Sequence, residues 1–354
     1  MKPRPELVLT LLTFVFVSCR SIGPATISRD RFDYSTAMTE SWKRQMLLNI
    51  VKLRYVDPPI FVDVGQIVAG YQVDHFGGFS AQVNSGSAGD FGNVRGEIRF
   101  TDRPTLTYTP LTGSRFTASL ITPISPASLF HVIQSGWPAD LILRLGTSSI
   151  NGHPSSDRFE TRAAPSDGSN YFRILELMRR LQANHAVSVR IETDEAKQTT
   201  TLVTLRAPDL TRELVDAAEE LRTLLGLDAT ATEFRLSYGA RASSPQEIAL
   251  HTRSLFSVMA MFADYVAVPA TDLADGRVAL PRAVIDARHD VIRIHSGKTA
   301  PEDAFVAIDY RNHSFWIDDR DLFTKRAFAL IMLFFTLAET DTRTNQPVLT
   351  IPTG

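Results

Sequence analysis

The densest group of side chains able to do chemistry is acidic. Three carboxylates stand together in the segment Asp318-Asp319-Arg320-Asp321, and Asp309 lies a few residues earlier. Grouped carboxylates can bind a hard cation or act as general acid and general base. A long helix is expected to begin at the same place, and acidic side chains there accept hydrogen bonds from free backbone amides. Capping is the favoured interpretation, and catalysis by one of these four aspartates is the alternative.

The other reactive residue types form no compact motif. The eight histidines are dispersed, without the HExxH spacing that places two imidazoles on one helix face. His289 and His295 would share a face only along a regular strand. Neither a GxSxG nucleophile elbow nor an SxxK motif is present. We therefore predict no metal and no cofactor, while a catalytic triad assembled from dispersed Ser, His and Asp stays open.

Glycines recur between positions 76 and 96, among serine, asparagine and aspartate. Neither GxxxxGK[ST] nor GxGxxG occurs in this stretch, so a nucleotide site is not expected. The composition predicts a flexible loop or an irregular hairpin. Long irregular segments in folded domains often have a function, and a loop that binds a partner is the functional interpretation.

The amino terminus has the layout of a secretory signal. Lys2 and Arg4 precede the apolar stretch 7–17, which is too short to span a bilayer. Residues 16–19, Phe-Val-Ser-Cys, resemble a lipobox, the processing site of bacterial lipoproteins, and Cys19 is the only cysteine of the chain. The resemblance implies that residues 1–18 are removed and that Cys19 is acylated on its thiol and its freed amine.

The expected location follows from this resemblance. Several acyl chains on one residue anchor a protein stably, whereas a single chain binds a membrane only marginally. Arg20 follows the cysteine. An Asp at that position would resemble an inner-membrane retention signal, so the outer membrane is favoured, with the protein facing the periplasm.

Length, composition and charge limit the classes of protein to which the chain can belong. With 354 residues, 44% of them hydrophobic and 21% charged, the chain can bury a core and build two domains or one large domain with subdomains. The formal net charge is -2, and no run of Lys and Arg forms a basic patch, so nucleic-acid binding is not expected. A single cysteine excludes an internal disulfide and a cysteine-based metal cluster.

Hydrophobic periodicity places the secondary structure. Helices are expected at 28–55, 114–121, 125–134, 171–183, 210–225, 244–266 and 318–338. Strands are expected at 60–73, twice within 97–109, and at 187–191, 200–205, 233–238, 291–295, 304–310, 314–317 and 348–351, while 141–145 fits a strand or a helix end. Because helices and short strands follow one another without regular βαβ alternation, the predicted class is α+β with mixed or antiparallel sheets.

The predicted organisation has five parts. A signal peptide (1–18) is followed by the lipidated cysteine and a tether (19–33), an N-terminal α+β subdomain (34–150), an exposed loop (151–169) and a C-terminal α+β subdomain (170–354). The segment 327–338, AFALIMLFFTLA, is apolar all round and predicts a buried helix. A neighbouring subunit is one source of cover for such a helix.

Three segments resemble those of a group of uncharacterised envelope lipoproteins of Gram-negative bacteria. They are RDRFDY at 29–34, SWKRQMLLNIVKLRY at 41–55 and FWIDD at 315–319. The resemblance extends over most of the mature chain. It implies a location in the cell envelope, but it brings no activity, ligand or catalytic residue with it.

Three functions are therefore expected, in order of preference. The first is a non-enzymatic lipoprotein that binds or scaffolds other components of the envelope. The second is a lipid-anchored hydrolase of an envelope polymer, with Asp309, Asp318, Asp319 and Asp321 as its first candidates. The third is a subunit of a homo-oligomeric envelope assembly. The expected partners are the membrane, through the lipid anchor, and an envelope protein or a second copy of the chain.

The lipid prediction can be tested by metabolic labelling with a radioactive or clickable fatty acid. The wild-type chain should incorporate the label and Cys19→Ser should not, because the predicted attachment points both belong to this residue. Equal labelling of the two chains, or no labelling of either, would contradict the prediction.

Overall fold

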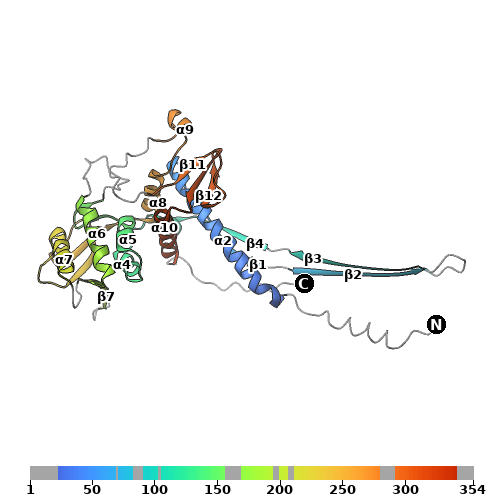
Figure 1. The fold of residues 1–354 in the computed structure, drawn as a ribbon, viewed down its shortest axis with the longest axis horizontal. Helices are drawn as coiled ribbons and strands as arrows, with labels where there is room; N and C mark the ends of the chain where they lie inside the picture. Colours follow the sequence, from blue (N-terminus) through green and yellow to red (C-terminus); the bar gives the residue numbers. More distant parts are fainter. Residues whose placement is uncertain are drawn as a thin grey trace. The chain divides into compact units, whose positions relative to one another are not determined.

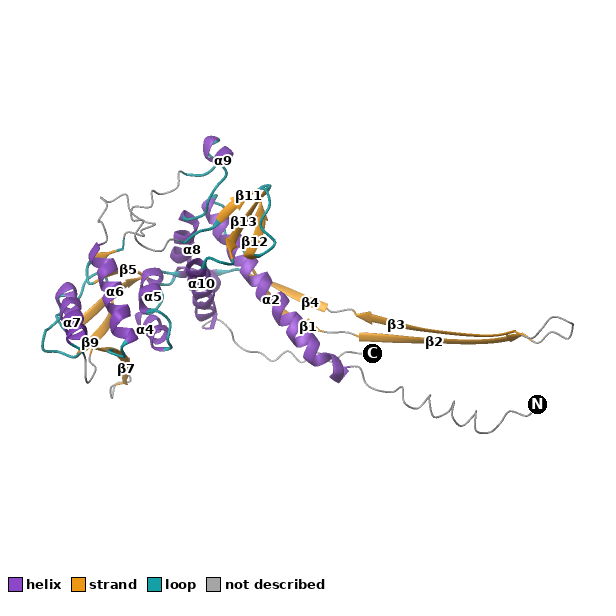
Figure 2. Cartoon of the chain, in the orientation of Figure 1, coloured by secondary structure: helices purple, strands orange, loops and turns teal. Residues whose placement is uncertain are grey.

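The computed structural model describes residues 23–68, 71–82, 91–102, 105–155, 169–193, 199–205, 211–279 and 292–340 (Figure 1). Cys19, the signal segment, His289 and the expected strand 348–351 lie outside these ranges. Helices and mixed or antiparallel sheets confirm the α+β class (Figure 2). The chain divides into unit 1, Met1–Trp42 with Val62–Leu111, and unit 2, Lys43–Phe61 with Thr112–Gly354. The subdomain boundary expected at 151–169 stays a prediction, because residues 156–168 lie outside the described ranges.

Unit 1 contains the first part of helix α2 (Gly23–Arg54) and four strands. These are β1 (Phe61–Val68), β2 (Tyr71–Gln82), β3 (Phe91–Asp102) and β4 (Thr105–Leu111). β1 pairs with β4, and β2 pairs with β3. The strands follow one another along one long hairpin (Figure 1). We call the paired strands β2 and β3 the ribbon.

Of the two structures predicted for 76–96, a flexible loop or an irregular hairpin, the described residues form a hairpin, and its pairing is regular. The ribbon is regular antiparallel pairing from Tyr71 opposite Asp102 to Gln82 opposite Phe91, without a register shift. Gly77 stands opposite Gly96 within it. Glycine weakens a strand but does not forbid extended backbone, and the alternating residues around these glycines favour strand pairing. The remaining positions, 83–90, lie outside the described residues.

The burial of helix α2 changes along its length. From position 30 to Trp42 no described residue is buried, whereas Met46, Leu47, Ile50 and Val51 are at most 2% exposed in unit 2. The helix begins at Gly23, five residues before the predicted start, and ends at Arg54, one residue before the predicted end at 55. Asn49 then fixes the exit of the chain, because its buried amide donates to the carbonyl of Ile60 (2.8 Å) and accepts from its N–H (2.9 Å).

A second polar contact ties the end of α2 to the short helix α9 (Ala270–Ala274). The Tyr55 hydroxyl donates to Asp272 at 2.7 Å, and both residues are buried. Burial and this hydrogen bond raise the pKa of Tyr55 above its usual value, so the phenol stays protonated. Arg311 lies over the ring of Tyr55, 5.0 Å from its centroid, and pairs with Asp57 at 3.2 Å.

The largest sheet of unit 2 has the strand order β6-β5-β10-β9-β8-β7. Its members are β5 (Thr147–Ile150), β6 (His153–Pro154), β7 (Val187–Thr193), β8 (Thr199–Leu205), β9 (Glu233–Tyr238) and β10 (Glu247–Thr252). β9 and β10 are parallel, and the other pairs are antiparallel. The strand pair predicted at 187–191 and 200–205 is confirmed.

Helices accompany this sheet at the expected places. They are α4 (Pro126–Gln134), α5 (Ala139–Gly146), α6 (Ser169–Ala183) and α7 (Arg212–Leu225). The segment 141–145 thus belongs to a helix and not to a strand. α6 packs against α5 and α7, and Arg173 joins α6 to Glu220 of α7 at 2.7 Å. Gly226 ends α7 in the left-handed conformation (φ 66°), as its position after the helix predicts.

A three-stranded sheet and three helices complete the described part of unit 2. The strands are β11 (His295–Gly297), β12 (Ala304–Tyr310) and β13 (His313–Asp318), with β13 in the middle. The strands predicted at 304–310 and 314–317 are confirmed as β12 and β13, and they pair in a hairpin. Arg311 and Asn312 between them both have positive φ, as a two-residue type I′ turn requires. The helices are α3 (Ser114–Ile121), α8 (Leu255–Asp264) and α10 (Leu322–Thr340).

Two further predictions are corrected. The segment 244–266 is not one helix: Glu247–Thr252 is strand β10, and α8 begins only after Ser254, whose hydroxyl accepts from the N–H of Ser257 at 3.1 Å. Ser244 followed by Pro245 favours the start of a helix locally. The burial of Ile248, Ala249 and Leu250 between two neighbouring strands outweighs that preference. The first residues of the expected exposed loop 151–169 form a turn and strand β6, and Ser155 is fully buried.

Burial of α10 is less complete than its sequence suggests. Phe328, Leu330 and Ile331 are fully buried, whereas Ala329 and Thr336 are exposed and Leu337 is 40% exposed. The helix therefore contributes to the core of unit 2 with part of its surface uncovered. Within the described ranges, no helix combines the length and the apolar character needed to cross a bilayer.

Candidate functional site

The predicted acidic cluster lies at the start of α10 and makes local contacts. Asp321 is the residue before the helix, and its carboxylate accepts from the N–H (3.0 Å) and the hydroxyl (2.8 Å) of Thr324. Asp318 accepts from the N–H of Arg320 at 2.8 Å, and Asp319 pairs with Lys325 at 2.6 Å. Each carboxylate thus has a hydrogen-bonding role in holding the turn that leads into the helix.

Asp309 does not join this cluster. It lies opposite Ser314 at the turn end of the β12–β13 hairpin, and Asp318 lies opposite Ala304 at the other end. Five residues of strand separate the two levels, which is about 17 Å at about 3.4 Å per residue. Paired carboxylates that cleave glycosidic bonds are about 5 to 10 Å apart. Asp309 instead accepts from the Ser314 hydroxyl at 2.6 Å.

Potential metal ligands are likewise dispersed in the described part of the chain. In the part of the chain that the structure describes, no three His, Cys, Asp or Glu side chains come together as a metal site would require. His295 of the expected histidine pair stacks on Trp316, with 5.6 Å between the ring centroids. The prediction of a site shared with His289 stays untested, because His289 lies outside the described residues.

One pair of reactive residue types was missed by the sequence analysis. The Ser148 hydroxyl of β5 lies 3.0 Å from Nδ1 of His251 on β10, and it also donates to the carbonyl of His251 at 3.0 Å. The two residues are 103 positions apart, so only the pairing of β5 with β10 brings them together. No local sequence signal could have found them.

The Ser148–His251 pair has part of the arrangement that an activated serine needs. A serine nucleophile works with a histidine base that a third group, commonly a carboxylate, holds in orientation. Among the described residues the ring of His251 has Tyr238 as its aromatic neighbour, edge-on at 5.9 Å, and no carboxylate bonds to it. The pair therefore links two strands and lacks the orienting acid of a triad.

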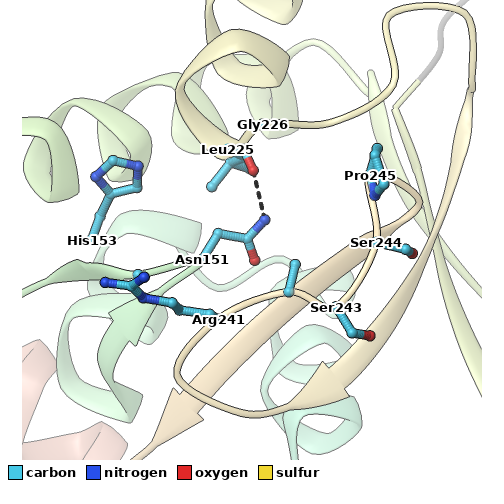
Figure 3. Close-up of a pocket in the computed structure, with 10 residues that line it drawn as sticks. Asn151, His153, Leu225, Gly226, Arg241, Ser243, Ser244 and Pro245 are labelled. Atoms are coloured by element: carbon cyan, nitrogen blue, oxygen red, sulfur yellow. Dashed lines mark hydrogen bonds between the residues drawn. The ribbon is translucent and has the colours of Figure 1, made fainter.

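A surface depression of about 460 Å³ lies at the edge of the six-stranded sheet (Figure 3). Three segments line it: the 151–153 turn between β5 and β6, the 225–226 end of α7, and the 241–245 segment before β10. Asn151 and Gly152 have positive φ (43° and 85°), which allows the tight turn.

The polar groups at the back of the depression hold these segments together. The Asn151 amide donates to the carbonyl of Leu225 at 2.8 Å, the contact drawn in Figure 3, and accepts from the N–H of Ala249 at 2.6 Å. Nε2 of His153 lies 2.8 Å from the carbonyl of Leu224. Asn151 and His153 are therefore engaged in fixing the end of α7 against the sheet.

Glu247, a buried carboxylate beside the depression, is held in its ionised form. It accepts hydrogen bonds from the hydroxyls of Ser237 and Ser243 and from the N–H of Ser243 (2.8 Å), and these contacts lower its pKa to about 2. Arg235 lies 3.9 Å away and acts in the same direction. A carboxyl group that stays ionised near neutral pH cannot serve as a general acid there.

The lining leaves one cationic group for a ligand. Arg241 is exposed at the rim of the depression, and no described carboxylate pairs with its guanidinium. The hydroxyls of Ser243 and Ser244 lie in the same segment (Figure 3). The carbonyls at the end of α7 oppose an anion, however, since a helix C-terminus carries partial negative charge. The exposed guanidinium of Arg241 and these carbonyls therefore act on an anion in opposite directions.

The pKa of Glu247 predicts a pH-dependent stability. A carboxyl group whose pKa is lower in the folded chain stabilises that chain above its unfolded pKa, and the contribution is lost as pH falls through the folded value. The free energy of unfolding in urea should therefore fall between about pH 4.5 and pH 2 more steeply for the wild type than for Glu247→Gln. Glu219→Gln, at an exposed position of α7, is the matched control and should follow the wild type. Parallel curves for all three chains would contradict the assignment.

Comparisons of the chain with protein-family models, with curated proteins and with solved structures found no match. Its function must therefore be argued from its own residues.

Proposed function

We propose that the protein is a lipid-anchored component of the bacterial cell envelope that binds or scaffolds other envelope components without catalysing a reaction. The lipobox-like sequence ending at Cys19 supports the anchor and the outer membrane facing the periplasm. The engaged carboxylates of Asp318, Asp319 and Asp321 support a structural use of the acidic cluster. The resemblance to envelope lipoproteins agrees with this proposal and stays a prediction.

The observation that carries the binding function is the exposed apolar surface of β4. Residues 105 to 110 are all exposed, with Leu106 at 43% and Tyr108 at 62%. These two residues are two positions apart, so they belong to the same face of the strand. In unit 1, Phe32 of α2 is also 71% exposed. Large apolar side chains exposed together on one face of a strand, as Leu106 and Tyr108 are, suit a surface that contacts another molecule.

The binding surface can be tested with a photo-crosslinking amino acid in living cells. Replacement of Tyr108 by p-benzoylphenylalanine should give crosslinked adducts on irradiation, because this ring lies on the proposed contact surface. Tyr238 is the matched control: it is also a tyrosine on a strand and is 55% exposed, but it lies in unit 2. Adducts of equal yield at both positions, or none at Tyr108, would contradict the proposal.

The Ser148–His251 contact favours a second candidate function, the lipid-anchored hydrolase of an envelope polymer. In that case the Ser148 hydroxyl would attack the substrate and His251 would take its proton. The missing orienting acid and the hydrogen bond from Ser148 to a backbone carbonyl make this candidate the weaker one.

A fluorophosphonate probe, which labels activated serines, separates the two candidates. The scaffold function predicts no labelling of the wild type, and Ser148→Ala should only lower the free energy of unfolding by about 1 kcal/mol through the lost hydrogen bond. Ser243→Ala is the control for a serine outside the histidine pair. Labelling that is present in the wild type and in Ser243→Ala but absent in Ser148→Ala would establish the hydrolase instead.

A further inference from the structure

The depression at the edge of the six-stranded sheet has one cationic side. Among the described residues that line it, Arg241 is the one lysine or arginine, and no aspartate or glutamate belongs to the lining. The stem of Arg241 lies against the turn at Gly152, where a Cβ atom on the glycine would be only 3.3 Å from Cγ of the arginine. Figure 3 shows this side chain on the same side of the depression as Asn151 and His153. The fold therefore places a cation at one wall.

The end of α7 supplies the opposite charge. The C-terminus of a helix carries partial negative charge and favours a cation. Leu225 and Gly226, at this end, both line the depression. The carbonyl of Leu225 accepts from Asn151, and a carbonyl oxygen has a second lone pair with which it can accept from a ligand.

Two ionised carboxylates add to the negative side. Asp228 follows the end of α7, and its N–H donates to the carbonyl of Pro245 in the lining at 2.9 Å. Hydrogen bonds from the hydroxyl and the N–H of Thr230 lower the pKa of Asp228. Glu247 accepts from the hydroxyl of Ser243, so the Ser243 oxygen can act only as an acceptor toward a ligand.

A ligand with a single charge does not suit both sides. An anion is attracted by Arg241 but repelled by the end of α7 and by Asp228, and a cation meets the reverse. We propose that the depression binds a zwitterionic α-amino-acid group, with its carboxylate on Arg241 and its ammonium toward the end of α7. The site lies in unit 2 and is separate from the contact surface of β4, on which it does not depend.

Size and donor geometry agree with this class of ligand. The volume of about 460 Å³ lies within the range of small-molecule sites, about 300 to 1,000 Å³. The planar guanidinium of Arg241 offers parallel N–H groups that match the two oxygens of a carboxylate. Phosphate sites commonly use a helix N-terminus or successive backbone N–H groups, whereas α7 presents its carbonyl end here. A free amino acid and the end group of an envelope peptide present the same two charges.

The test is isothermal titration calorimetry of the full lipoprotein, purified in a non-ionic detergent, with alanine and two analogues. Alanine should bind saturably. N-acetylalanine lacks the ammonium and alaninamide lacks the carboxylate, so each should bind at least about tenfold more weakly, because one side of the depression then has no charged partner.

Two variants of the chain test the two sides separately. Arg241→Gln should weaken alanine about tenfold without weakening alaninamide, since it removes only the partner of the carboxylate. Asp228→Asn should weaken alanine and alaninamide about threefold without weakening N-acetylalanine. Unfolding would weaken all three ligands, so these patterns separate a lost ligand contact from a lost fold. Arg326→Gln, at an exposed position of α10, is the matched control and should follow the wild type.

Two further ligands identify the source of the amino-acid group. The tripeptide Ala-γ-Glu-diaminopimelate leaves the distal end of its diamino acid as a free α-amino-acid group. Tighter binding of this tripeptide than of alanine would indicate an envelope peptide, and weaker binding a free amino acid. Glycerophosphoethanolamine carries the zwitterion of a lipid headgroup, and tighter binding of it than of both would overturn the amino-acid assignment.

Three results with the first set of ligands would also overturn the assignment. They are no saturable binding of alanine by the wild type, equal affinities for alanine and N-acetylalanine, and equal losses in Arg241→Gln and Arg326→Gln. None of them bears on adducts formed at Tyr108, so the proposed function and this site fail or stand separately.

Discussion

Two paired strands have two faces and two open edges, and this constraint governs what unit 1 can be. The ribbon satisfies the backbone groups between its strands, and an isolated pair of strands is only marginally stable in water. In β4, six consecutive residues are exposed, and Leu106 and Tyr108 are among them. In the proposed function, this exposed surface of β4 contacts another component of the envelope.

In unit 2, by contrast, several polar side chains form hydrogen bonds with other residues of the same unit. The buried Tyr55–Asp272 contact and the Asn49 clamp fix the end of α2. Asn151 fixes the end of α7, and Asp321 caps α10. Asp321, a catalytic candidate in the sequence, thus stabilises the start of a helix, as the other polar groups stabilise turns and helix ends. In the proposed function, unit 2 is the stable support and unit 1 carries the contact surface.

Local signals predicted much of the fold. Gly226 after a periodic helix, and the polar turn at Arg311 and Asn312, specify their structures through a few neighbouring residues. Other predictions were wrong because segments distant in the sequence bury each other. β10 lies in the middle of a sheet, although Ser244-Pro245 just before it resembles a helix start. The glycines of the ribbon obscured the alternation of residue types along its strands. The Ser148–His251 pair forms only because two strands pair whose residues are 103 positions apart. The candidate site was therefore less predictable than the elements that carry it.

Hydrogen–deuterium exchange of the protein in native membrane vesicles and after purification in mild detergent tests the central claim most directly. Backbone amides of an exposed strand exchange slowly only where a partner restricts solvent access or local opening. If β4 is a contact surface, peptides covering Thr105–Leu111 should exchange at least about threefold more slowly in the membranes than after purification, while peptides of the α6 helix, Ser169–Ala183, stay unchanged. Equal exchange of the β4 peptides in the two preparations would contradict the account.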